Sequence, residues 1–93
     1  MIKSFKTAAI EALWNGRLVK GMPADLAKVT KRKLVMIDAA TSLDDLRNPP
    51  ANRLEALKGT RGGQYSIRVN DQFRLCFAWR DGAAHDVEFV DYH

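Results

Sequence analysis

Arg68 and Arg74 stand on the two arms of a predicted β-hairpin and could together hold an anion. Apolar and polar residues alternate in both arms, as they do in strands that bury one face. A three-residue loop, residues 70–72, gathers the apolar residues on one face and places Arg68 directly opposite Arg74 on the outer, exposed face. Like charges in that position destabilise a sheet, so the pair indicates an anion between them, and planar guanidinium donors suit a phosphate.

Other interpretations of this hairpin stay open. A carboxylate of Asp91, Glu88 or Glu55 could neutralise the arginines, or both side chains could point apart into water. A two-residue turn would instead pair Arg68 with Phe73 and mix apolar and polar residues on each face. The pattern by itself does not decide between a phosphate site and a neutralised pair of arginines.

Asp91, Tyr92 and His93 form a second group of residues that could take part in chemistry. Histidine titrates near neutral pH and can transfer protons, and tyrosine can stack on an exposed base. The plainer interpretation is the end of a strand that carries a surface histidine, and these three residues taken alone favour it.

The elements that position these residues follow from hydrophobic periodicity and from capping residues. Residues 2–5 alternate like a short strand, Thr7 can cap a helix that ends near residue 15, and Pro23 suits the start of a longer helix that ends near residue 40. A short turn at residues 42–46 and a break at residues 48–50 follow. Residues 53–57, 64–70, 73–79 and 85–92 are predicted strands. This order predicts one α+β domain that spans residues 1–93.

The composition is that of a small globular protein with a mild preference for polyanions. The chain has 93 residues, a formal net charge of +4 and a pI of about 9.5, and basic surfaces favour partners such as nucleic acid. The single cysteine, Cys76, excludes an internal disulfide, and we see no Cys/His spacing typical of a metal site. We expect a cytoplasmic protein, because the sequence shows neither a signal peptide nor an apolar run that could span a bilayer.

Four stretches of the sequence resemble a known toxin family. They are residues 1–5 (MIKSF), 52–59 (NRLEALKG), 63–77 (GQYSIRVNDQFRLCF) and 90–93 (VDYH). Together they are similar to HigB-type toxins of the RelE/ParE superfamily, over essentially the whole chain. The resemblance implies a RelE-like fold, with two N-terminal helices packed on a small antiparallel sheet. It also implies the toxin of a type II toxin–antitoxin system, a ribosome-dependent mRNA endonuclease that uses no metal or cofactor: the 2′-hydroxyl attacks the adjacent phosphate and displaces the 5′-oxygen.

The resemblance also implies roles for the candidate residues. Arg68 and Arg74 match the motif arginines and would stabilise the charge of the transition state. In the C-terminal motif His93 would transfer a proton, Asp91 would orient His93 or Arg74, and Tyr92 would hold or stack the nucleotide. Some family members carry a histidine near the position of Glu55, so this carboxylate is a further candidate for the general base.

Six basic side chains are expected to contact RNA or the ribosome: Lys28, Lys31, Arg32, Arg53, Lys58 and Arg61. The plainer interpretation of the run formed by Lys31, Arg32 and Lys33 is a solvated helix face. The implied partners are the 70S ribosome with mRNA and a cognate antitoxin with a helix-turn-helix DNA-binding domain. Operator DNA would be bound through that antitoxin alone, and no membrane is involved.

Two other functions fit parts of the sequence. A ParE-like gyrase inhibitor would share the fold, but it would need neither the paired arginines nor His93. A non-catalytic nucleic-acid-binding module would bind RNA or DNA without cleaving it. The arginine pair and the C-terminal motif favour the nuclease over both.

Overall fold

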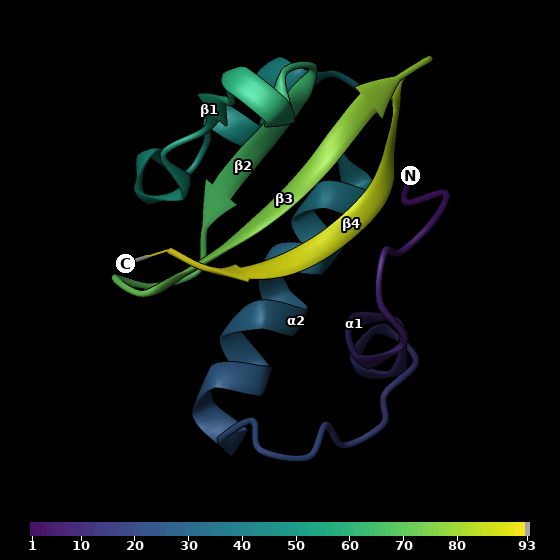
Figure 1. The fold of residues 1–93 in the computed structure, drawn as a ribbon, viewed down its shortest axis with the longest axis vertical. Helices are drawn as coiled ribbons and strands as arrows, with labels where there is room; N and C mark the ends of the chain where they lie inside the picture. Colours follow the sequence, from purple (N-terminus) through teal and green to yellow (C-terminus); the bar gives the residue numbers. More distant parts are fainter. Residues whose placement is uncertain (93) are drawn as a thin grey trace.

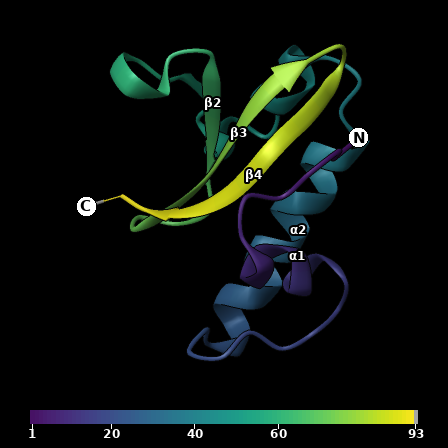
Figure 2. The ribbon, with the colours of Figure 1, turned by 45° about the vertical axis from the view of Figure 1, so that its right-hand side comes forward.

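Two helices lie against one face of a four-stranded antiparallel sheet in the computed structural model, which describes residues 1–92 (Figure 1). The strands are β1 (Glu55–Ala56), β2 (Gln64–Arg68), β3 (Phe73–Arg80) and β4 (Ala83–Asp91), and they follow one another in the sheet in chain order. The end of β4 lies beside the loop between β2 and β3 (Figure 1, Figure 2). The predicted α+β layout is confirmed.

Both helices begin and end close to their predicted positions. α1 spans Ala8–Trp14, and the Thr7 side chain caps it by accepting a hydrogen bond from the amide of Ile10. α2 spans Ala24–Ala39, with Pro23 as its N-cap. Their apolar faces meet the sheet in one core, because helical spacing gathers such residues on one side. Its buried members include Ile10 and Leu13 of α1, Leu34 and Ile37 of α2, and Ile67, Leu75 and Phe77 of the sheet.

The hairpin between β2 and β3 has the predicted register. Arg68 pairs with Arg74, and Ile67 pairs with Leu75. The Asn70 side chain explains the three-residue loop, because its Oδ1 accepts hydrogen bonds from the backbone amides of Gln72 and Phe73, at 2.9 and 2.8 Å. An asparagine that bonds to the backbone ahead of it is a common turn-former.

The predicted strand at residues 2–5 forms isolated parallel bridges rather than a continuous strand. Ile2 pairs with Ala84 and Phe5 pairs with Val87, so this segment runs along the outer edge of β4. Between the two bridges Asp86 has a φ of 53°, which interrupts the regular backbone of β4. Its amide donates instead to the Ser4 hydroxyl at 2.9 Å. The ladder is broken for this reason, but the edge of the sheet is still covered.

The first strand of the sheet is shorter than predicted. We predicted a strand over residues 53–57, but β1 contains two residues, because Arg53 has a left-handed φ of 45°. Two short 3-10 helices, Leu43–Arg47 and Pro50–Asn52, precede it, joined by a cis peptide bond between Asn48 and Pro49. A third, Gly59–Arg61, separates β1 from β2. Residues 43–54, which we call the irregular segment, therefore lead into β1 without an α-helix or a strand.

The prediction of a solvated run at residues 31–33 is wrong for two of its three residues. Arg32 is exposed, but Lys33 is buried beneath the irregular segment, where its Nζ donates to the Asn52 side chain at 2.6 Å. Lys31 is partly buried: it donates to the Trp14 carbonyl, and its Nζ lies 4.6 Å from the centre of the Trp14 ring. In residues 1–92 we find no helix whose length and apolar character would let it cross a bilayer.

Candidate functional site

A polar hollow of about 280 Å³ opens on the outer face of the sheet, the face turned away from the helices. The residues that line it come from the segment before β1, from β1 to β3, and from the chain directly after β4. They are Arg53, Glu55, Arg68, Asn70, Asp71, Arg74 and Tyr92. The fold thus brings four of the six predicted catalytic residues together, with the two arginines on one face as predicted.

Arg74 is held in this hollow by directional contacts. Its Nε donates to the Ser66 hydroxyl at 2.8 Å, and its Nη2 donates to the Arg53 carbonyl at 2.5 Å. The Glu55 carboxylate lies 3.7 Å from Nη1. The guanidinium plane is therefore fixed before any ligand binds, as electrostatic stabilisation of a transition state requires.

The prediction that both arginines are exposed is wrong for Arg74. Arg74 lies on the outer face as expected, but only 7% of it is exposed, because the irregular segment and β1 fold over it. The Tyr92 ring lies on the same group, with its centre 5.7 Å from Arg74 Cζ, within the range of a cation–π contact. Tyr92 remains 42% exposed, so its ring is also available to a ligand.

Arg68 is held more loosely than Arg74. It pairs with Asp71, whose side chain is 99% exposed. Exposed ion pairs of this kind contribute little to stability, so a phosphate can replace the Asp71 carboxylate at low cost. Sequence reasoning did not single out Asp71, although its position three residues after Arg68 was a usable signal.

Asp91 lies on the other side of the sheet from the arginines. It is paired with Phe73, whose side chain faces the helices, and residues opposite each other in a ladder share a face. Its carboxylate accepts a hydrogen bond from the Gln72 side chain at 3.2 Å. Arg74 itself donates hydrogen bonds to the Ser66 hydroxyl and to the Arg53 carbonyl. His93 lies outside the described residues.

Two of the carboxylates that could have neutralised the arginine pair, Glu55 and Glu88, lie at different sites. Glu55 contacts Arg74, so the predicted neutralisation is observed for one of the two arginines. Glu88 pairs with Arg61 at 2.5 Å and with Lys6 at 3.5 Å. The hydrogen bond that Arg61 donates to the Glu88 carboxylate raises the pKa of Arg61 further above its usual value. The lining of the polar hollow contains three arginines, Arg53, Arg68 and Arg74, against two carboxylates, Glu55 and Asp71, so it keeps a formal net positive charge.

The six cations expected to contact RNA or the ribosome are not equivalent. Arg53 lines the hollow, and Lys28, Arg32 and Lys58 are exposed. Lys31 and Arg61 are engaged within the protein, by Trp14 and Glu88 respectively. We therefore expect the exposed group to contribute most to a contact with a polyanion.

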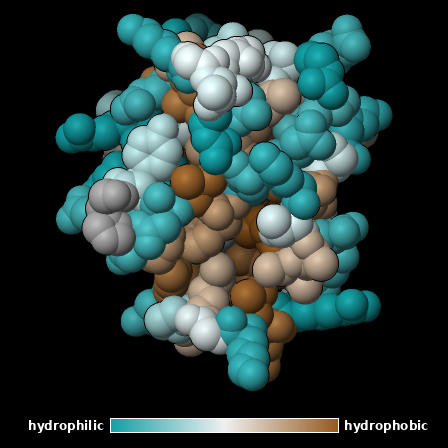
Figure 3. Space-filling view, viewed as in Figure 1, coloured by the Kyte–Doolittle hydropathy of each residue, from teal (hydrophilic) through white to brown (hydrophobic). Residues whose placement is uncertain are grey.

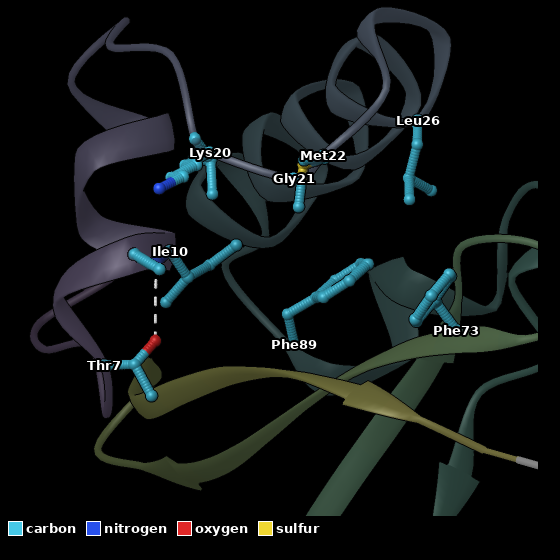
Figure 4. Close-up of a pocket in the computed structure, with 10 residues that line it drawn as sticks. Thr7, Ile10, Lys20, Gly21, Met22, Leu26, Phe73 and Phe89 are labelled. Atoms are coloured by element: carbon cyan, nitrogen blue, oxygen red, sulfur yellow. Dashed lines mark hydrogen bonds between the residues drawn. The ribbon is translucent and has the colours of Figure 1, made fainter.

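A second hollow, of about 240 Å³, lies on the opposite side of the sheet and is apolar. Figure 3 shows apolar residues gathered below β4 on this face, and Figure 4 shows that Phe89, Phe73, Ile10 and Leu26 point into the hollow. The rings of Phe73 and Phe89 are stacked, with their centres 4.6 Å apart. Lys20 is the charged residue in its lining, so this hollow lacks the paired groups that acid–base chemistry needs.

Neither a metal cluster nor a reactive thiol is found near the polar hollow. Among residues 1–92, no group of three or more His, Cys, Asp or Glu side chains is arranged to hold a metal ion. Cys76 is buried, and burial raises the pKa of its thiol, which keeps it protonated. We interpret Cys76 as a packed residue.

Two helices on a small antiparallel sheet, with an arginine pair on its outer face, form the architecture that the sequence predicted, a RelE-like fold. The chain is similar in structure to a chain of the YoeB–YefM complex from Staphylococcus aureus, with a TM-score of 0.63 and 20% identity over 100% of this chain and 98% of that one. A family model described as the RelE-like toxin of type II toxin–antitoxin system HigB matches residues 3–93. The chain belongs to this family.

Two relatives support the assignment across most or all of the chain. Toxin HigB-1 from Vibrio cholerae is 46% identical over 72 residues, which are 77% of this chain and 75% of that protein. Endoribonuclease HigB from Proteus vulgaris is 36% identical over 93 residues, 100% of both chains. The resemblance to HigB-type toxins is confirmed.

Proposed function

We propose that this toxin is a metal-independent endoribonuclease that cleaves mRNA on the ribosome. One observation carries the proposal: Arg74 is buried, fixed by directional hydrogen bonds and aimed into a hollow that it shares with Arg68 and Tyr92. A relative that matches the whole chain is named as an endoribonuclease, in agreement with this chemistry. A gyrase inhibitor on the same fold would not need an arginine held in this way.

The arginine pair supplies the electrostatic part of the reaction. The 2′-oxygen of a nucleotide forms a bond to the adjacent phosphorus, and the bond from that phosphorus to the 5′-oxygen breaks. Negative charge gathers on the phosphoryl oxygens, where Arg74 and Arg68 provide planar donors. The Glu55 carboxylate lies 3.7 Å from Arg74 Nη1. The phosphate either takes the place of this carboxylate beside Arg74 or binds next to it, where Glu55 can act as the base. The Tyr92 ring stacks on a base beside the scissile bond.

Two proton transfers complete the reaction. A base removes the proton of the 2′-hydroxyl, and an acid protonates the departing 5′-oxygen. We assign His93 to proton transfer and keep Glu55 as the alternative base, because its carboxylate lies in the hollow. Asp91, in the same C-terminal motif, is assigned to the orientation of His93.

The ribosome and an antitoxin are the proposed partners, in the cytoplasm. A hollow of this size offers few groups to position RNA, so the ribosome supplies the orientation that lowers the barrier. Lys28, Arg32 and Lys58 are exposed and suited to ribosomal RNA. The solved neighbours are complexes with an antitoxin, YefM. We propose a cognate antitoxin for this toxin. Its helix-turn-helix domain binds operator DNA on behalf of the toxin–antitoxin complex.

Mapping of mRNA 5′ ends after expression of the chain tests this function. We expect new 5′ ends within translated reading frames, and none when Arg74→Ala is expressed at the same level. Purified toxin should cut ribosome-bound mRNA much faster than the same RNA alone. Intact mRNA together with gyrase-dependent DNA breaks would establish the alternative function instead.

A further inference from the structure

The position of Arg74 depends on the backbone carbonyl of Arg53. This carbonyl accepts from Arg74 Nη2 at 2.5 Å, so a shift of the segment before β1 would move the guanidinium. Arg53 has φ 45° and ψ 58°, a left-handed conformation that is unfavourable for a residue with a Cβ atom. The surrounding structure must therefore hold residue 53 in place.

Asn52, directly before Arg53, is the side chain that fastens this segment. It is fully buried, and its Nδ2 donates to the carbonyls of Leu46 and Asn48, at 3.2 and 3.3 Å. Its Oδ1 accepts from Lys33 Nζ at 2.6 Å. One amide thus joins three parts of the chain: both short 3-10 helices and α2.

A charged lysine at position 33 is unfavourable for the stability of the fold, because its side chain is buried. It is 7% exposed, and burial, together with the neighbouring charges of Arg32 and Arg68, lowers its pKa. No carboxylate is among its contacts in residues 1–92; the partner is the neutral Asn52 amide. An apolar side chain of similar length would avoid the cost of burying a charge, so stability alone does not explain a lysine here.

We propose that Lys33 and Asn52 are positioning residues for Arg74. Neither lines the polar hollow. The Lys33 ammonium orients the Asn52 amide, the amide fixes the segment that carries the Arg53 carbonyl, and this carbonyl fixes Arg74. Their effect on cleavage rests on the proposed function, whereas their effect on the order of Arg74 does not.

The first test measures the order of Arg74 without RNA. In wild type the Arg74 Nε–H is bonded to Ser66, so its NMR signal should exchange slowly with water. We expect Lys33→Met to speed this exchange about tenfold or more, the size expected when one hydrogen bond from a charged group is lost. Lys28→Met is the matched control, an exposed lysine of the same helix, and should leave the exchange unchanged.

A second variant removes the other half of the contact. Asn52→Asp keeps an acceptor for Lys33 but loses both donations to the carbonyls of Leu46 and Asn48. It should also speed exchange at Arg74, and it decides the question if Lys33→Met fails to fold. Wild-type exchange at Arg74 in a folded variant of either kind overturns the proposal.

The second test is a double-mutant cycle on cleavage. Lys33→Met should lower the single-turnover rate on ribosome-bound mRNA about tenfold while ribosome binding stays unchanged. In an Arg74→Ala background it should cause no further loss, because it acts through Arg74. A merely structural role predicts equal losses in both backgrounds and would refute the assignment. If wild type cleaves nothing, the proposed function fails, and the exchange measurement alone decides the positioning role.

Discussion

Phe73 and Arg74 are neighbours in the sequence, yet they line hollows on opposite faces of the sheet. On the Phe73 face, apolar packing fixes the side chains. The Phe73 ring stacks on Phe89, and Ile10 lines the same hollow. The Arg74 side is held by hydrogen bonds to Ser66 and to a backbone carbonyl. Packing is non-directional and determines how stable the fold is, whereas hydrogen bonds determine where a charged group points. We therefore expect substitutions on the Phe73 face to lower the free energy of unfolding, and substitutions on the Arg74 face to lower the rate of cleavage.

The largest expected effect comes from removal of the guanidinium. Arg74→Ala should lower cleavage about 100- to 1,000-fold, the usual loss when one transition-state donor is removed. Arg74→Lys should restore part of the rate, because an ammonium cannot reproduce the planar fork. Single-turnover cleavage of ribosome-bound mRNA measures both, and separate ribosome-binding assays should show little change. Rates near wild type for Arg74→Ala would place this residue outside the reaction.

Deletion of His93 tests the proton transfer at the same hollow. We expect the rate to fall roughly 100-fold. Combined with Arg74→Ala the loss should be smaller than the product of the two, because both groups act on one transition state. Glu55→Gln is the comparison variant. An unchanged rate without His93, with a large loss in Glu55→Gln, would move the proton transfer to Glu55.

The apolar side should change stability without changing chemistry. Ile10 is 2% exposed and lines the apolar hollow, so Ile10→Val should lower the free energy of unfolding by about 0.5–1.5 kcal/mol. Urea denaturation measures this change. Cleavage per folded molecule should match wild type. A loss of cleavage greater than the loss of folded protein would show that the two faces are coupled.

The smallest effect is expected outside both hollows, at Asp45. The backbone amides of Thr41 and Ser42 donate to its carboxylate and lower its pKa below the usual 3.8. A lowered folded-state pKa stabilises the fold above pH 3.8, and this stabilisation is lost as the pH falls through the folded value. Asp45→Asn should therefore melt below wild type at neutral pH, and the two melting temperatures should converge in acid. A constant difference at every pH would contradict this origin.

The features that the sequence predicted are local ones. The register that sets Arg68 opposite Arg74 follows from alternation in two adjacent strands and from the turn chemistry of Asn70. The burial of Arg74 and Lys33 could not be predicted in the same way. It depends on Arg53 and Asn52, which reach these side chains through an irregular segment that no periodicity describes.

Strand irregularities limited the prediction of the C-terminal residues. The ladder between β3 and β4 shifts register between Cys76 and Ala78, and Asp86 adds a left-handed residue to β4. Each irregularity can exchange the faces that simple alternation assigns. The resemblance, rather than alternation, suggested Asp91 as a partner of His93 or Arg74, and the register of β4 places Asp91 opposite Phe73.

The hydrogen bond from the Asp86 amide to the Ser4 hydroxyl joins residues 82 positions apart, and it bears on the order in which the fold is completed. The backbone amides of Lys3 and Lys6 donate to the carbonyls of Ala84 and Val87, so the N-terminal segment is not fully paired until β4 is in place. Contacts of such long range form late in folding. A nascent chain that stops short of β4 lacks the covered sheet edge and the Tyr92 ring over Arg74. The site around Arg74 is therefore complete only after β4 has paired with β3 on one side and with the N-terminal segment on the other.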